Sequence, residues 1–343
     1  MKKGNSKVVL AGLMALLLSG CVMALQPAPP LPDFTKLEAG DVVLTFSGSA
    51  DSWLLALSAS PAPDRLIIPY SHVEALYRNK EGQLMLGGVS RGRVRASRFE
   101  GVVKRLEHMA VFRADLPKAQ RGRVAKILEG WVNDPRIQAA GFDYSFQDVP
   151  GRRNKFSCLG IINEAYRASG IEAPFIARPW TPNAVGRHLQ KLLGVKLDKI
   201  TAPESIFSNP RFYRVIRWQN ANVDATKAGM RGAMLRMVLA WYEQGWRLRS
   251  ADGFHLGLLL ADLPDEVNQM ARTRSQLRVF TLDVFKTWER MKRRGKTKNL
   301  NLKQRRVLLE AICIKYRGTY FIFDSGDDTA GDRVRRAEAS SPG

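Results

Sequence analysis

The stretch FSCLGIINEAYRASG, residues 156–170, decides the fold that we predict for this chain. Its apolar residues recur at the spacing of one helical face, at positions 158, 161, 162, 165 and 166. Ser169-Gly170 is a typical helix stop. The pattern predicts a helix that begins near Cys158 and places this side chain in the first turn, on the inward face.

A histidine lies 86 residues before this cysteine, in Tyr70-Ser71-His72-Val73, at the start of a predicted strand. A nucleophilic cysteine needs at least a base, such as an imidazole, that can take the proton of its thiol. The positive end of a helix favours a thiolate, and so does a neighbouring imidazolium. The alternative is that Cys158 is a structural cysteine in the core. Its predicted inward position agrees equally well with this role. Papain-type enzymes place Cys before His, so the reversed order indicates a circular permutation.

The rest of the chain predicts an α+β fold. Strands are expected at residues 40–46, 72–77, 83–89 and 107–113, and helices at 50–58, 117–131 and 158–168. After residue 200 the chain becomes helical, with amphipathic segments at 227–248, 281–291 and 302–316. We therefore expect an α+β domain at 38–200, a helical basic domain at 201–323, and a disordered tail at 324–343.

Three motifs occur in a fixed order: Gly40-Asp41-Val42-Val43-Leu44, Tyr70-Ser71-His72-Val73, and the segment 156–171, preceded by Asp143-Tyr144-Ser145-Phe146. Together they resemble the permuted NlpC-type papain-fold hydrolases of the YiiX/YaeF-like group. The resemblance covers roughly residues 38–190. It implies a circularly permuted papain-like domain in which Cys158 is the nucleophile and His72 the base. The implied substrate is an amide or ester, either a cell-envelope peptide or a lipid-derived acyl group, and no metal or organic cofactor is implied.

The third residue of the site departs from the family pattern. Members carry a polar residue that orients the histidine on the following strand, where this chain has Gly87. Glu74 is a substitute candidate, because residues i and i+2 of a strand share a face. The alternative, which the sequence favours, is that Glu74 is an exposed strand carboxylate. An unoriented histidine would leave a slow enzyme or an inactive binding module, so a pseudoenzyme is the competing hypothesis.

The first residues predict export and lipid anchoring. Lysines precede an apolar run of about 11 residues, too short to span a bilayer but typical of a signal peptide. Leu18-Ser19-Gly20-Cys21 follows and resembles a bacterial lipobox, so residues 1–20 are the expected signal and Cys21 the lipidated residue. A cleaved signal with a chance cysteine is the alternative. Residues 21–37 form a Pro-rich tether, and Val22 favours the outer membrane, facing the periplasm.

The composition is that of a strongly basic globular protein, with 45% hydrophobic residues and a formal net charge of +22. For an exported chain this charge favours anionic lipid or cell-wall polyanions over nucleic acid as partners. A basic run expected to contact such a surface comprises Arg290, Lys292, Arg293, Arg294, Lys296 and Lys298. The alternative is an ordinary solvated face. Cys313 lies in an apolar helical stretch and is expected to be a buried thiol.

Overall fold

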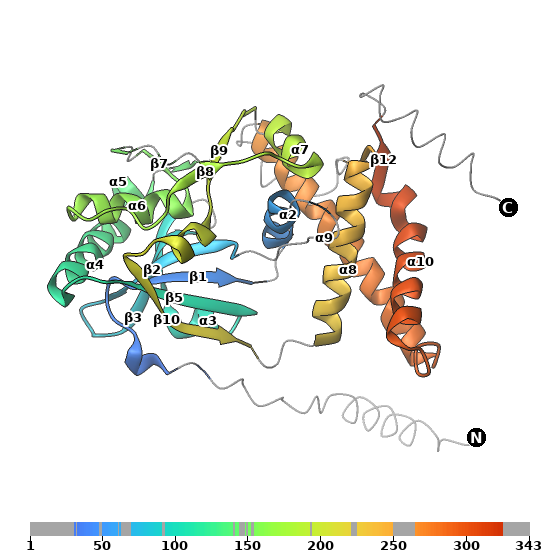
Figure 1. The fold of residues 1–343 in the computed structure, drawn as a ribbon, viewed down its shortest axis with the longest axis horizontal. Helices are drawn as coiled ribbons and strands as arrows, with labels where there is room; N and C mark the ends of the chain where they lie inside the picture. The colour runs from blue at the N-terminus through green and yellow to red at the C-terminus, as the bar shows by residue number, and fades with distance from the viewer. Residues whose placement is uncertain are drawn as a thin grey trace, which may run out of the picture.

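The computed structural model describes residues 31, 33–47, 50–60, 62, 70–90, 93–139, 141–143, 148, 150–151, 154–192, 194–220, 225–249 and 265–324. Within this part the chain has an α+β fold built on an antiparallel sheet of six strands, in the order β10-β5-β1-β2-β3-β4 (Figure 1). The strands are β1 (Val42–Phe46), β2 (His72–Arg78), β3 (Leu84–Ser90), β4 (Arg93–Arg98), β5 (His108–Ala114) and β10 (Phe212–Gln219).

Both faces of this sheet are covered, which follows from the alternation of side chains along a strand. Val42, Leu44 and Val73 point to a core beneath the helices α4 (Lys118–Asn133) and α6 (Cys158–Ala168). Val43 and Leu76 point to a second core with η1 (Phe34–Lys36) and α3 (Phe99–Val103). Shorter elements complete this region: α5 (Pro135–Gln138), β6 (Gly141–Phe142), β7 (Lys155–Phe156), β8 (Ala177–Pro179), β9 (Lys199–Thr201) and η3 (Pro203–Ser208).

A buried ionic cluster fixes the start of β1 and explains the Gly40-Asp41 motif. The Asp41 carboxylate is fully buried and accepts two hydrogen bonds from Arg113, at 2.7 and 2.8 Å. Gly40 has a φ of +92°, and a Cβ there would lie 2.5 Å from the Arg121 carbonyl oxygen, so only glycine fits. The Tyr166 hydroxyl of α6 donates to the Gly40 carbonyl at 2.8 Å. Through these contacts β1, β5, α4 and α6 are locked together.

A third core lies in the helical part of the chain, on the opposite side of the molecule from α4 and α6 (Figure 1). Its large buried side chains include Trp241, Phe280 and Trp288. The elements that contribute to it are α2 (Ala50–Ala59), α7 (Ala184–Leu192), α8 (Ala225–Glu243), β11 (Trp246–Leu248), α9 (Asp265–Arg293), α10 (Leu302–Tyr320) and β12 (Phe321–Phe323). None of the described helices is long and apolar enough to cross a membrane.

The predicted boundary at residue 200 does not separate these cores. Strand β10 lies after the boundary but completes the sheet beside β5. Helices α2 and α7 lie before it but pack with the C-terminal helices. The strands β4, β10 and β11 were not predicted, and α9 is much longer than the segment 281–291. The expected signal peptide 1–20, Cys21 and residues 325–343 of the expected tail lie outside the described residues.

Candidate active site

Cys158 is the first residue of α6, as its sequence pattern predicts. Ser157 is the N-cap, and its hydroxyl accepts a hydrogen bond from the Gly160 amide at 3.0 Å. This is the role in which serine is preferred, because the first amides of a helix have no partner within it. The Cys158 side chain is largely buried and packs into the core beneath the sheet. The thiol therefore sits at the positive end of a helix dipole.

His72 is the first residue of β2, where three contacts fix the backbone. It pairs with Thr45 of β1, and the preceding amide, that of Ser71, donates to the Thr45 carbonyl at 2.9 Å. The Tyr70 amide donates to Oε1 of Glu204 at 2.8 Å. Because α6 packs against β2, Cys158 is a neighbour of the imidazole and contributes to its pKa. The structure thus brings together the two residues that the sequence separates by 86 positions.

Glu74 is the second acidic neighbour of the imidazole. Its Oε1 is 3.7 Å from Nε2 of His72, an ion-pair distance that is longer than a hydrogen bond. Nε2 is buried and has no hydrogen-bond partner among the described residues, so this carboxylate is its polar neighbour. The Glu74 side chain is 5% exposed and that of His72 is 30% exposed. The interpretation of Glu74 as an exposed strand carboxylate is therefore wrong.

Two adjacent glycines of β3 explain this arrangement. A Cβ at Gly87 would lie 2.8 Å from the side chain of Leu128 in α4, so no orienting side chain fits at that position. A Cβ at Gly88 would lie 3.0 Å from Cγ of Glu74. Gly87 thus lets a helix pack on the sheet, and Gly88 leaves room for the Glu74 carboxylate.

The charge state of His72 sets it apart from the other described histidines. Burial by itself would lower the pKa of His72, but hydrogen bonding to Cys158 and the Glu74 carboxylate raise it to about 10. At 3.7 Å we ascribe the effect of Glu74 mainly to its charge. For His108 and His188 burial, helped by the charge of a nearby arginine, lowers the pKa of each to about 4. At neutral pH His72 is thus an imidazolium, and the other two are neutral.

Cys313, the second cysteine in the described part of the chain, has a thiol that we expect to be unreactive. Cys313 lies in α10, fully buried, and burial raises its pKa to about 12. Cys158 and Cys313 are both free, so the two are not joined by a disulfide. Cys313 therefore provides an internal control for the reactivity of Cys158.

Sequence reasoning missed an aromatic cluster beside His72. Tyr70 stacks against Phe207 with ring centroids 5.9 Å apart, and its edge meets His108. The ring of Phe46 stacks on His108 at 4.7 Å. Phe207 remains 46% exposed, so an aromatic surface flanks the start of β2. Residues from four separate segments build it, which no local pattern signals.

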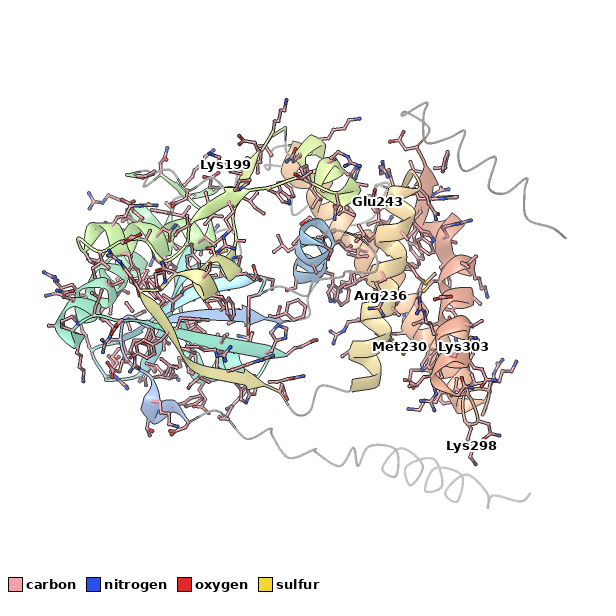
Figure 2. All side chains as sticks on the ribbon, in the orientation of Figure 1. Lys199, Met230, Arg236, Glu243, Lys298 and Lys303 are labelled. Carbon is pink, nitrogen blue, oxygen red and sulfur yellow. The ribbon has the colours of Figure 1, made fainter. Side chains whose placement is uncertain are left out.

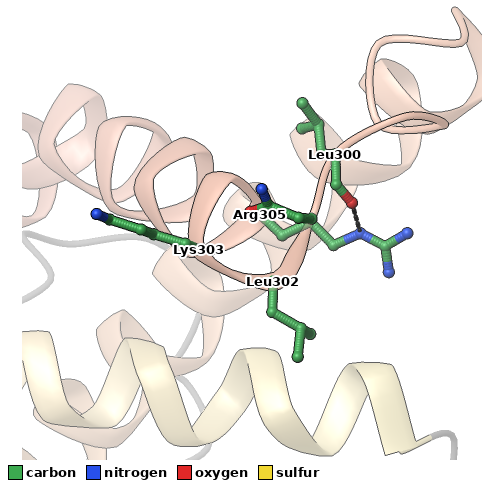
Figure 3. A pocket seen from close by; sticks show the side chains of 5 residues that line it. Leu300, Leu302, Lys303 and Arg305 are labelled. Atoms are coloured by element: carbon green, nitrogen blue, oxygen red, sulfur yellow. Dashed lines mark hydrogen bonds between the residues drawn. The ribbon is translucent and has the colours of Figure 1, made fainter.

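The remaining candidate residues lie elsewhere. All six residues of the predicted basic run are exposed, at the end of α9 and in the turn after it. A shallow pocket lined by Leu300, Leu302, Lys303 and neighbours opens beside that turn, away from Cys158 (Figure 3). Across the described ranges, no group of three or more His, Cys, Asp or Glu side chains is arranged to hold a metal ion.

Comparisons with known proteins assign no family. No protein-family model matches the chain, and no curated protein matches it. A solved structure with some likeness is that of the metalloprotein YiiX from Escherichia coli O157:H7. It is 16% identical, covers 54% of this chain and 99% of its own, and has a TM-score of 0.42. At this level the likeness carries no conclusion about this chain, and the site rests on its own geometry.

Proposed function

We propose that the chain is a thiol hydrolase or acyltransferase that acts on an amide or ester. Cys158 is the nucleophile, His72 the acid and base, and Glu74 the positioning residue. The observation that carries the proposal is an imidazole that has both a thiol at a helix start and a buried carboxylate as neighbours. In a thiol nucleophile the imidazole stabilises the thiolate and the carboxylate orients the imidazole, which is the arrangement that these three residues match.

The raised pKa of His72 decides how the reaction begins. The imidazolium is already formed at neutral pH. We propose that its charge and the start of α6 favour a thiolate on Cys158, so that thiolate and imidazolium are the proposed resting pair. The thiolate attacks the carbonyl carbon, and the carbonyl electron pair moves to oxygen. Collapse of this intermediate breaks the bond to the leaving nitrogen or oxygen, which takes the proton from His72.

The second half restores the resting pair. Water, or another acceptor, gives a proton to the neutral His72 and attacks the acyl-thioester at Cys158. The acyl group leaves, and the sulfur departs as thiolate beside the renewed imidazolium. Backbone amides at the start of α6, including that of Cys158, are the proposed donors to the oxyanion. Glu74 keeps the imidazole oriented through both halves.

The proposal also covers the type of domain and its location in the cell. The sheet and α6 are proposed to form a circularly permuted papain-like domain, supported by the order of the motifs carrying His72 and Cys158. The proposed location is the outer membrane, facing the periplasm, through lipid on Cys21. The lipobox after a short apolar run supports this location.

The test is the rate of labelling by an electrophilic thiol probe between pH 5 and pH 9. We expect rapid labelling of wild type at pH 7 and none at this site in Cys158→Ala. His72→Ala should slow it on the order of tenfold to hundredfold at pH 7. Cys313→Ala is the matched control and should label like wild type. If His72→Ala labels at the wild-type rate, Cys158 is a core thiol and the chain is a pseudoenzyme.

A further inference from the structure

The turn between α9 and α10 is a rigid, defined structure. Helix α9 ends on a Schellman motif: the amide of Gly295, at φ +72°, donates to the Lys292 carbonyl, and the next amide donates to that of Met291, both at 3.0 Å. Helix α10 begins with a capping box between Asn301 and Gln304. We call residues 290–307 the hairpin tip. Its shape is fixed before any partner arrives, which lowers the entropic cost of binding.

The hairpin tip concentrates positive charge without acidic residues. Nine basic residues lie in 290–307, and no Asp or Glu does. Lys298 projects from the end of the hairpin (Figure 2). Acidic residues flank the hairpin tip: Glu289 directly precedes it, and Glu310 lies 2.9 Å from the Nε of Arg306. The nine residues are Arg290, Lys292, Arg293, Arg294, Lys296, Lys298, Lys303, Arg305 and Arg306.

Apolar side chains stand exposed among these charges. Leu302, the first residue of α10, is 84% exposed, and Val307 is 58% exposed. Arg305 donates through Nε to the Leu300 carbonyl at 3.0 Å, which holds the chain entering α10 in place (Figure 3). One exposed leucine is ordinary on a protein surface. Fully exposed leucine within a basic, rigid turn is instead the composition of segments that lie in a bilayer interface.

We propose that the hairpin tip docks on an anionic lipid bilayer, with Leu302 inserted among the acyl chains and the basic side chains on the head groups. The charge identifies the partner as anionic, and the exposed leucine favours a bilayer over a soluble polyanion. The opposite faces of both helices are held in the core by Trp288, Leu309 and Cys313. The tip therefore positions the whole body, and this role is independent of the thiol chemistry.

The electrostatic part is tested by sedimentation of the full chain with vesicles of phosphatidylcholine, with or without phosphatidylglycerol. Every variant shares the same N-terminal segment, so differences report the tip. Neutralising three tip residues to Gln should weaken binding to anionic vesicles at least about tenfold. Neutralising three exposed basic residues elsewhere removes equal charge and should change binding less than about twofold. The tip triple is Lys292, Arg294 and Lys298, and the control triple is Lys80, Arg98 and Lys126.

The apolar part separates a bilayer from other polyanions. Leu302→Ser should weaken binding to anionic vesicles about fivefold to tenfold, and Ile314→Ser, an exposed control farther along α10, should not. A photoreactive residue at position 302 should crosslink to lipid acyl chains. The proposal is overturned if the two triples weaken binding equally. It is also overturned if Leu302→Ser binds like wild type and the crosslink to lipid is absent, which would leave a contact with soluble polyanions.

Discussion

Replacing Glu74 with Gln should lower the pKa of His72 by about one unit or more. Coulomb's law gives about 1 kcal/mol for unit charges 3.7 Å apart in water, and about 4.5 kcal/mol at an effective dielectric constant of about 20. At about 1.4 kcal/mol per pKa unit these limits correspond to about 1 and about 3 units. Because the His72 side chain is 30% exposed, solvent screens the pair, and we expect a value near the lower limit.

The sign is set by the direction of the shift. Cys158 and Glu74 together raise the pKa of His72 to about 10, so removing the Glu74 charge lowers that value. Unfolding returns the imidazole to its ordinary value of 6.5. The stability that comes from the protonated ring is therefore complete below pH 6.5 and disappears as the pH rises toward about 10. In Glu74→Gln it should disappear at a lower pH.

The assay is NMR titration of the imidazole resonances, which needs no substrate. The chain has four histidines, so assignment by substitution is practical. His188 serves as an internal control, because its low pKa arises from burial and should not move. Gly88→Ala places a methyl group against Glu74 and should lower the pKa of His72 by a smaller amount. A change below about 0.3 unit in Glu74→Gln would refute the assignment of Glu74 as the positioning residue.

Three further outcomes are expected. Gly87→Ala should lower the free energy of unfolding by about 1–3 kcal/mol in urea denaturation, because the new methyl group meets Leu128, while the pKa of His72 stays unchanged. Arg113→Ala should cost about 3–5 kcal/mol at pH 7, since it leaves the buried Asp41 carboxylate without its cation; a loss below about 1 kcal/mol would contradict this reading of the cluster. Cys21→Ser should abolish incorporation of labelled lipid, and unchanged mass and membrane retention would exclude the anchor.

The local sequence pattern was sufficient to predict the two elements that carry Cys158 and His72. The helix of Cys158 follows from the i, i+3, i+4 spacing and the Ser157 cap, and the strand of His72 from its apolar run. The role of Glu74 was hidden, because its burial depends on Gly88 of the neighbouring strand. The local sequence Val73-Glu74-Ala75 does not show whether the Glu74 carboxylate is buried or exposed to solvent.

Long-range contacts explain the remaining misses. Strand β10 has mostly exposed or half-exposed side chains and two arginines, so it does not show the alternation expected of a sheet strand. It is recognised only by its pairing with β5. The bond from the Tyr70 amide to Glu204 spans 134 residues. A single sequence carries no signal for such a pairing.

These contacts join the two parts of the chain across the expected boundary at residue 200. Glu204 and Phe207 reach the chain two residues before His72 from beyond the expected boundary at residue 200. The Ala184 amide, from within the expected first domain, donates to Glu243 of α8 at 3.1 Å. The sheet that carries His72 and the C-terminal helices are therefore joined by contacts from both sides of residue 200.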